Sequence, residues 1–248
     1  MNSLPEAGAL HAVHVLETSA ALDTTPAVIP RYLEATYWWA YVHPRAVRLF
    51  ERQWLVNMIL WGNFARLRDA AIAELEPGLG GRTLQIACVY GDLTPRLAAR
   101  VPAGAQLDVV DVLPVQLRNL HAKLAPPAPV RTHLADSTAL DFATGSFDQA
   151  LVFFLLHEQP AEARRRTMAE ALRVVRPGGR VVLVDYHKPR FWHPLRALMR
   201  LVLAALEPYA LDLWETELAD WLPSGFEARS VVTQTYFGGL YQKVVIEV

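Results

Sequence analysis

Acidic side chains follow two short apolar runs of this chain, at positions where they could bind a ligand. Asp111 comes within LDVVDV, at the end of one run, and Asp136 lies in HLADSTALDF, after another. A carboxylate at the end of a strand can accept hydrogen bonds from both hydroxyls of a ribose, and a second can accept one from an exocyclic amine. The spacing therefore predicts a nucleoside-binding edge, although each carboxylate taken alone is equally typical of a helix cap or a solvated loop.

A second set of polar residues could activate an electrophile. His157 and Glu158 follow the run FFLL, and Asp185 and His187 stand around the end of another run. Residues two apart in an extended segment point to the same side. Carboxylate and imidazole groups are ligands for divalent ions, which polarise a substrate oxygen. We expect Glu158, Asp185 and His187 as candidate metal ligands; one of the histidines or Glu158 could instead be a general base, or the histidines could be structural.

Short apolar runs alternate with helical segments through the middle of the chain. The strand-like runs are 82–87, 107–112, 130–134, 147–155 and 181–186, with helical segments at 93–100, 114–124 and 161–175. This alternation predicts parallel pairing with right-handed crossovers. Runs 226–237 and 240–248, separated by Gly238 and Gly239, predict a hairpin. The expected fold is α/β, a doubly wound Rossmann-like sheet, mostly parallel, with an antiparallel C-terminal hairpin.

Aromatic flanks surround this middle part. Of the seven tryptophans, Trp38, Trp39, Trp54 and Trp61 lie before it and Trp192, Trp214 and Trp221 after it. Residues 1–30 have no Lys or Arg and no sustained apolar run, so we expect a loosely ordered segment without a secretory signal. A helical cap is predicted over 31–78, interrupted at Gly62. The cofactor-binding domain then covers 79–248, with a helical insertion at 192–222. The segment 36–44 could close over the cofactor or simply start a packed helix.

Composition excludes several classes of protein. The chain has 24 basic and 25 acidic residues among 248, so the charge excess of a nucleic-acid binder is missing. Its single cysteine excludes a disulfide framework and suits the cytoplasm. No run reaches the about 18 apolar residues that span a bilayer. The segments 54–61 and 191–214 suit either interfacial helices or helices packed on the sheet edge, which favours a peripheral membrane protein. Arg164, Arg165 and Arg166 are expected on a solvated helix face.

The first strand is followed by LQIACVYGD, in which Gly91 is the sole glycine. Together with Asp111, Asp136, the LRVVRPGG run at 172–179 and the hairpin, this arrangement resembles the class I S-adenosylmethionine-dependent methyltransferases over roughly residues 80–185. The first motif of that family is an acidic residue followed by three alternating glycines, and here it reads Gln85, Ala87, Val89, Gly91. The resemblance implies S-adenosylmethionine as cofactor, while the missing acid and glycines speak against ordinary methyl transfer.

A wider resemblance covers residues 31–248. The segments TYWWAYVHPRAVRLFERQWLVNMILWGNF, ACVYGDLTPRLA, FFLLHEQP and VDYHKPRFWHPLR resemble the bacterial rhodoquinone biosynthesis family. That resemblance implies conversion of ubiquinone to rhodoquinone at the inner membrane, with an amino group replacing a ring methoxy group. It also implies S-adenosylmethionine as nitrogen donor and a divalent metal, manganese. A methyltransferase acting on a quinone or lipid, and a non-catalytic scaffold that binds S-adenosylmethionine, are the alternatives.

The resemblance carries over to specific positions. The cofactor-binding residues that it implies are Gln85, Ala87, Cys88, Val89, Gly91, Asp111, Val112, Leu113, Asp136, Ser137, Thr138 and Phe153. The catalytic candidates are Tyr90, His157, Glu158 and His187. Because a carboxylate raises the pKa of a neighbouring amine, the uncharged Gln85 could keep a donor amine available for attack, or it could be drift in a tolerant turn. Cys88 is expected to be a small buried apolar residue.

Overall fold

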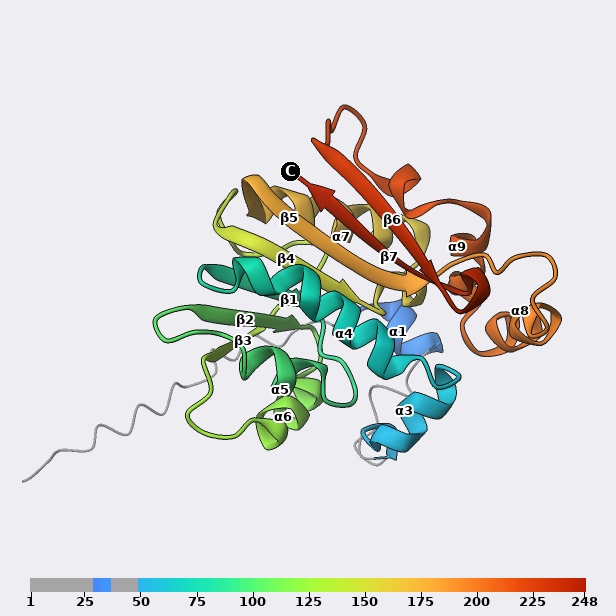
Figure 1. The fold of residues 1–248 in the computed structure, drawn as a ribbon, viewed down its shortest axis with the longest axis horizontal. Helices are drawn as coiled ribbons and strands as arrows, with labels where there is room; N and C mark the ends of the chain where they lie inside the picture. Colours follow the sequence, from blue (N-terminus) through green and yellow to red (C-terminus); the bar gives the residue numbers. More distant parts are fainter. Residues whose placement is uncertain (1–28, 37–48) are drawn as a thin grey trace, which may run out of the picture.

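The computed structural model describes residues 29–36 and 49–248, and its elements are arranged as in Figure 1. The strands are β1 (Arg82–Ile86), β2 (Gln106–Asp111), β3 (Val130–Leu134), β4 (Phe147–Phe153), β5 (Val175–Tyr186), β6 (Ser230–Tyr236) and β7 (Tyr241–Glu247). The helices are α1 (Arg31–Thr36), α3 (Gln53–Ile59), α4 (Phe64–Leu75), α5 (Leu93–Ala98), α6 (Pro114–Lys123), α7 (Ala161–Val174), α8 (Arg196–Leu206) and α9 (Asp212–Glu215).

All seven strands form one sheet in the order β3-β2-β1-β4-β5-β7-β6. Strands β1 to β5 pair in parallel, whereas β7 pairs antiparallel with both β5 and β6. The predicted doubly wound α/β fold with a terminal antiparallel hairpin is confirmed. Its strand order reverses between β1 and β4, and ligands of such sheets bind at this switch point.

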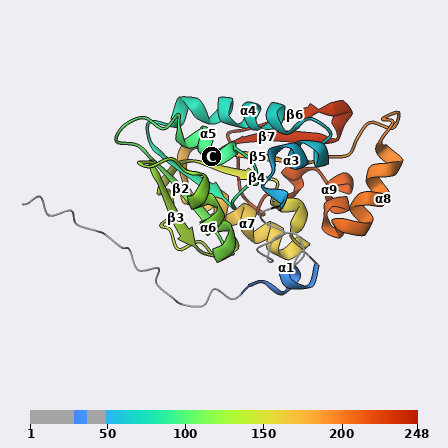
Figure 2. The ribbon, with the colours of Figure 1, turned by 90° about the horizontal axis from the view of Figure 1, so that it is seen from below.

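Helices cover both faces of the sheet, with α4 on one face and α7 on the other (Figure 2). Alternate strand residues face the two layers: Val109 and Leu151 pack on the α4 side, and Val110 and Val152 on the α7 side. Strands buried on both faces need apolar residues at successive positions. This need explains why the central strands read as continuous apolar runs.

The N-terminal helical segment is interrupted at Gly62, as its sequence predicts: Trp61 and Gly62 both adopt positive φ, at 51° and 78°, and separate α3 from α4. Strand β5 begins at Val175 rather than at residue 181 and includes Gly179. A Cβ atom on Gly179 would lie 2.4 Å from the carbonyl oxygen of Asp148, so only glycine lets the strand pass there. The hairpin closes through a short turn, Phe237–Gly239.

The predicted loose segment and most of the segment 36–44 lie outside the described residues. The predicted helical insertion contains α8, α9 and short 3-10 turns, including η4 (Pro208–Leu211). Among the described helices, none combines the length and apolar character that crossing a bilayer requires.

Candidate active site

A first cavity lies at the carboxyl ends of β1, β2 and β3. Its wall contains predicted cofactor-binding residues, together with residues from α1, α6 and the loop after β4. The wall residues are Tyr32, Leu33, Ala87, Cys88, Val110, Asp111, Val112, Leu113, Gln116, Ala135, Asp136, Ser137, Phe154, Leu155 and Glu158. We call it the nucleoside cavity, because the two strand-end carboxylates in its wall are the groups expected to bind a ribose and an amine.

Asp111 is fixed by the backbone around it. Its carboxylate oxygens accept hydrogen bonds from the backbone N–H groups of Cys88 and Leu113, each at 2.8 Å. Burial raises the pKa of Asp111 from 3.8 to about 6, against the lowering effect of these backbone hydrogen bonds. The group is therefore ionised at neutral pH and oriented before any ligand arrives.

The second carboxylate lies at the end of β3. Asp136 lines the nucleoside cavity with Ser137, whose hydroxyl lies 2.9 Å from that of Thr167 on α7. Thr138 is not in the wall; its backbone N–H donates to Asp136 at 2.8 Å. Thr138 thus orients the acid rather than facing the cavity.

The turn after β1 keeps a tight backbone despite its missing glycines. Ala87 has a φ of 72°, and its N–H donates to Val110 of β2 at 2.8 Å. Gln85 is fully buried and does not line the nucleoside cavity. Its amide nitrogen donates to the Ala87 carbonyl at 2.9 Å, and its oxygen accepts from Thr94 at 3.0 Å. Gln85 therefore holds the turn from behind.

Gly91 is required by packing rather than by ligand contact. Its φ is 80°, and an added Cβ would lie 2.9 Å from the ring of Phe64. Its N–H donates to Glu51 at 3.2 Å, and it lies in neither cavity wall. This surviving glycine thus seats the turn against α4.

The nucleoside cavity encloses about 60 Å³, far less than the roughly 300–1,000 Å³ of ordinary ligand pockets. Tyr32 and Leu33 of α1 cover it, and Leu33 packs on Leu113. The carboxylates, the exposed turn of Ala87 and Cys88, and the switch point fit S-adenosylmethionine in chemistry and position. With Tyr32 and Leu33 in place, the volume of the cavity is too small for the whole cofactor.

A second cavity of about 710 Å³ adjoins the first, and we call it the apolar cavity. Its wall comes from α3, the start of α4, the ends of β4 and β5, and α8. The wall residues are Phe50, Leu55, Val56, Met58, Ile59, Leu60, Trp61, Phe64, Cys88, Val89, Tyr90, Phe153, Phe154, His157, Glu158, Tyr186, Met199, Val202, Leu203, Leu206 and Glu207. Val89 and Phe153, predicted as cofactor-binding residues, and Tyr90, predicted as a catalytic residue, line this cavity.

Two contacts organise the apolar wall. The indole N–H of Trp61 donates to the sulfur of Met199 at 3.1 Å, which joins the turn after α3 to α8. The hydroxyl of Tyr90 accepts from Gln116 at 2.9 Å, and its ring stacks on Phe50 at 6.0 Å between centroids. Burial raises the pKa of Tyr90, so its phenol keeps its proton.

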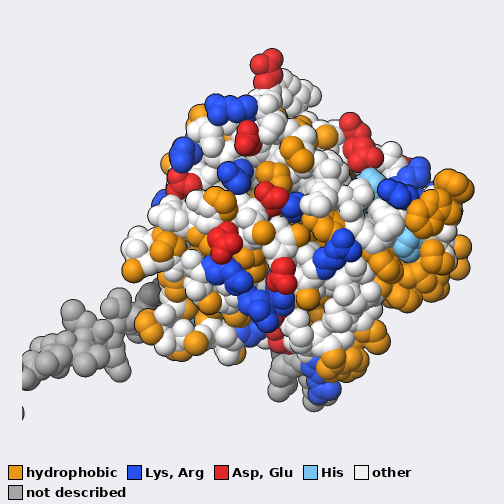
Figure 3. All heavy atoms as spheres, viewed as in Figure 1, with side chains coloured by type: hydrophobic (Ala, Val, Ile, Leu, Met, Phe, Trp, Pro, Cys, Tyr) orange, Lys and Arg blue, Asp and Glu red, His pale blue; other side chains and the backbone are white. Residues whose placement is uncertain are grey.

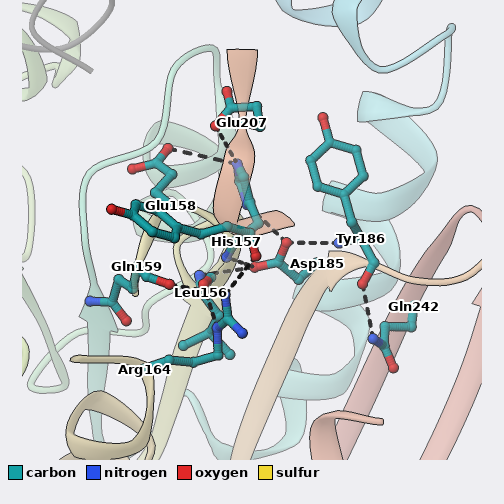
Figure 4. A network of polar contacts seen from close by, with 10 residues as sticks. Leu156, His157, Glu158, Gln159, Arg164, Asp185, Tyr186, Glu207 and Gln242 are labelled. Carbon is teal, nitrogen blue, oxygen red and sulfur yellow. Dashed lines mark hydrogen bonds and ion pairs between the residues drawn. The ribbon is translucent and has the colours of Figure 1, made fainter. Parts of the chain in front are cut away.

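The two cavities share Cys88, Phe154 and Glu158, and His157 lies beside this junction. Figure 4 shows the imidazole between Asp185 on one side and Glu158 and Glu207 on the other. Its Nδ1 lies 2.8 Å from Asp185, and its Nε2 lies 3.9 Å from Glu158 and 4.0 Å from Glu207. Burial lowers the pKa of His157, but the three carboxylates, Asp185 most strongly, outweigh it and raise the pKa from 6.5 to about 9. His157 is thus a buried cation at neutral pH.

Arg164 secures the segment that carries His157, and its predicted place on a solvated helix face is wrong. It is fully buried, and its guanidinium donates to the carbonyls of Leu156 at 2.8 Å and Tyr209 at 2.8 Å. The same group lies 4.4 Å from the ring centre of Trp221. Arg164 therefore ties the turn that bears His157 to the segment that follows Glu207. Arg165 and Arg166 are exposed as predicted.

The predicted metal-binding set is not brought together. Asp185 is used by His157 and by the backbone N–H groups of Leu156 and Tyr186. His187 instead lies 2.7 Å from the Gly239 carbonyl and 3.4 Å from Glu217, outside both cavities. Within residues 29–36 and 49–248, no group of three His, Cys, Asp or Glu side chains has a geometry that could hold a metal ion. The prediction assumed one continuous strand through His187, whereas β5 ends at Tyr186.

Of the tryptophans in the two aromatic flanks, Trp38 and Trp39 lie outside the described residues. Trp61 lines the apolar cavity, and Trp192 is exposed without lining it. Trp214 and Trp221 are buried as packing residues. The C-terminal tryptophans therefore do not share one site.

Two wall residues of the junction were missed by sequence reasoning. Glu207 and Tyr186 both line the apolar cavity, and the Tyr186 ring meets His157 edge to face at 4.9 Å between centroids. Glu207 carries the sole carboxylate between residues 187 and 211, directly after an apolar helix. That isolation was the available signal.

Comparison with known proteins agrees with this geometry. Residues 83–179 match the family Methyltransf_25, described as a methyltransferase domain. The uncharacterized methyltransferase sll0829 of Synechocystis is 29% identical over 83% of this chain and 92% of its own length. The ubiquinone/menaquinone biosynthesis C-methyltransferase UbiE of Geotalea daltonii is 28% identical over 50% of this chain and 53% of that protein.

Solved structures share the fold. Human N-acetylserotonin methyltransferase in complex with S-adenosylmethionine superposes with a TM-score of 0.60, at 12% identity, over 88% of this chain and 60% of that one. Its likeness concerns the fold alone. Residues 83–179, which match the methyltransferase domain family, thus form the central part of a Rossmann-like sheet of the kind found in solved methyltransferase structures.

Proposed function

We propose that the protein is an S-adenosylmethionine-dependent transferase that acts on ubiquinone and exchanges a ring methoxy group for an amino group, giving rhodoquinone. The observation that carries this proposal is the apolar cavity of about 710 Å³ that meets the nucleoside cavity at Cys88, Phe154 and Glu158. A quinone ring with its hydrocarbon tail fits the apolar cavity while its reactive carbon lies at the junction of the two cavities. The proposed place of action is the cytoplasmic face of the inner membrane.

The junction supplies the groups that this exchange requires. His157, held through Nδ1 by Asp185, can donate its Nε2 proton to a quinone oxygen and so draw electron density from the ring carbon. Glu158 lies in both walls and can accept the proton that an attacking amine loses. The ring carbon gains a bond to nitrogen, its bond to the methoxy oxygen breaks, and methanol leaves with that proton. The bond between this nitrogen and the donor's carbon must then break, with water giving its hydroxyl to that carbon and a proton to the nitrogen, so that a free amino group stays on the ring.

S-adenosylmethionine, when bound, supplies the nitrogen. The apolar side chains of α3 and α8 exclude water from the ring, and Glu158 holds the proton that the amine loses. Glu158, Asp185 and His187 do not form a ligand set for manganese. Gln85, buried behind the turn, acts through the backbone of Ala87 rather than on the donor amine.

Methyl transfer to a quinone ring is the second candidate. The relatives named as ubiquinone/menaquinone C-methyltransferases favour it, since they match about half of this chain. The same cavities would serve, with the cofactor's methyl group rather than its amine at the junction. The turn of Ala87, Cys88 and Val89, which replaces two glycines of the family motif, favours the amino exchange because it changes where the methionine end can lie.

One labelling experiment separates the two. The full chain is incubated with ubiquinone, or in a parallel reaction with demethylmenaquinone, whose ring still has a carbon that bears hydrogen. Each reaction contains S-adenosylmethionine carrying ¹⁵N at the amine and ¹³C at the methyl group, with and without manganese, and the quinone is analysed by mass spectrometry. The amino exchange predicts a product that has lost a methoxy group and gained ¹⁵N. A quinone that gains ¹³C would replace this proposal by methyl transfer, and an unchanged quinone would contradict both.

A further inference from the structure

The helices that wall the apolar cavity, together with the loop before α8, also carry exposed apolar side chains. Phe191 is 86% exposed, Leu201 70% and Trp54 59%. We define the apolar collar as these exposed residues around the cavity: Trp54, Met58, Ile59, Trp61, Phe191, Trp192, Leu198, Leu201 and Leu206. Figure 3 shows apolar side chains crowded over the end of the molecule where α8 lies. A water-soluble surface rarely gathers so many large apolar residues without a partner.

The collar is continuous with the cavity. Met58, Ile59, Trp61 and Leu206 belong to both, and the Trp61 to Met199 hydrogen bond joins its two halves. On α8 the inner residues Met199 and Leu203 are buried while Leu198 and Leu201 face outward. A helix that is apolar on both sides needs a second apolar neighbour.

The collar lies in a locally basic part of a nearly neutral chain. Segments 52–68 and 187–206 contain no Asp or Glu, although the whole chain has a net charge of −1. They carry the exposed cations Arg52, Arg66, Lys188, Arg190 and Arg200. The guanidinium of Arg190 lies 5.7 Å from the ring centre of Trp192. Aromatic rings flanked by cations are the combination found at the boundary between lipid headgroups and acyl chains.

We propose that the apolar collar docks on an anionic lipid bilayer, so that a lipid-soluble substrate passes between α3 and α8 into the apolar cavity without crossing water. The basic charge around the collar distinguishes a lipid bilayer from a second copy of this chain as its partner. In a symmetric dimer the same basic patch would face itself and repel, whereas anionic headgroups attract it. The docking proposal rests on the proposed function only for the identity of the lipid-soluble substrate.

Vesicle sedimentation of the full chain tests the docking. Vesicles of phosphatidylcholine alone are compared with vesicles that also contain phosphatidylglycerol, at low and high salt. We expect binding to the anionic vesicles that weakens with salt. The double variant Phe191→Ser with Leu201→Ser should lose about tenfold or more in partitioning, because both side chains leave water on docking. The double variant Arg190→Glu with Arg200→Glu should lose at least about tenfold on anionic vesicles.

Matched controls come from surfaces outside the collar, on the two edges of the sheet. Val231 and Val232 are exposed on the edge strand β6, and Arg118 and Arg131 on α6 and β3. Val231→Ser with Val232→Ser, and Arg118→Glu with Arg131→Glu, should bind vesicles as the wild type does. Equal losses in these controls, absence of wild-type binding to anionic vesicles, or a dimer that the collar variants convert to monomer without vesicle binding would each overturn the docking.

Turnover keeps this result separate from the proposed function. With a short-tailed, water-soluble ubiquinone, the collar variants should turn over at the wild-type rate, and only a long-tailed ubiquinone in vesicles should be affected. Vesicle binding without amination of either quinone would refute the proposed function and leave the docking standing. Equal loss of turnover on both quinones would refute the role of the collar in substrate entry.

Discussion

The two cavities of this protein meet at one turn but are built by different means. The nucleoside cavity is built from strand ends, where backbone N–H groups fix Asp111 and the fold itself sets the geometry. The wall of the apolar cavity consists of side chains, mainly those of α3 and α8, two helices that flank the sheet, together with the start of α4 and the ends of β4 and β5. One cavity follows from topology, while the other depends on which residues these flanking helices carry.

That contrast predicts a separation of roles. A change in the nucleoside cavity should act on the cofactor, and a change in the apolar cavity should act on the acceptor. His157 is expected to break the rule, because it lies at the junction of the two. Variants at the three places therefore test whether the cavities are as distinct as they look.

The largest effect is expected for His157→Asn. The amide can still donate to Asp185, but the proton at the junction is lost, so kcat should fall by about 10²–10⁴-fold. Binding of S-adenosylmethionine, measured by calorimetry, should change little. The rate is measured by product formation under saturating quinone.

His187→Gln is the matched control, since His187 contacts Gly239 and Glu217 rather than either cavity. Its rate should stay within about twofold of the wild type, the size expected of a surface change. A loss as large as that of His157→Asn would mean that the chemistry lies at the end of β5 and not at the junction.

The nucleoside cavity was the part that sequence could predict. Carboxylates at strand ends are local signals, and parallel pairing brings them to one edge, which located Asp111 and Asp136. The junction was harder. Asp185 and His187 share a side only within one continuous strand, and β5 ends at Tyr186. Glu207 reaches His157 through the docking of α8, a long-range contact that periodicity does not contain. Arg164 looked solvated because its partners, the carbonyls of Leu156 and Tyr209, are invisible in a run of three arginines.

Asp111→Asn should weaken S-adenosylmethionine binding by about 10–100-fold, because a charge-assisted hydrogen bond to a ribose hydroxyl contributes roughly 1.5–3 kcal/mol. The pKa of Asp111 is about 6, so the wild-type affinity should fall as pH drops through 6 and the carboxylate takes a proton. The variant has no such group and should show no change of affinity in that range. Calorimetry across pH 5 to 8 measures both.

Asp108 provides the matched control, because it is a buried strand carboxylate of β2 that contacts His133 and Arg82 and lies in neither cavity wall. Burial raises the pKa of Asp108, but the hydrogen bonds from His133 and Arg82 outweigh it and lower the pKa, so the carboxylate remains ionised across this range. Asp108→Asn should leave the pH dependence of cofactor affinity in place. A pH-independent wild-type affinity would show that Asp111 does not meet the cofactor.

The smallest effect is expected for Val202→Asn, which places an amide in the apolar wall on α8. The hydrocarbon tail of the quinone has no polar atom to pair with that amide, so KM for a long-tailed quinone should rise about 5–10-fold, while kcat and the affinity for S-adenosylmethionine stay unchanged. Ala204→Asn, on the exposed side of the same helix, controls for the loss of helix propensity and should leave KM unaltered. If Val202→Asn weakened cofactor binding as much as quinone binding, the two cavities would act as one site. If neither changed, the acceptor would not lie along α8, and the flanking helices would serve only to cover the sheet.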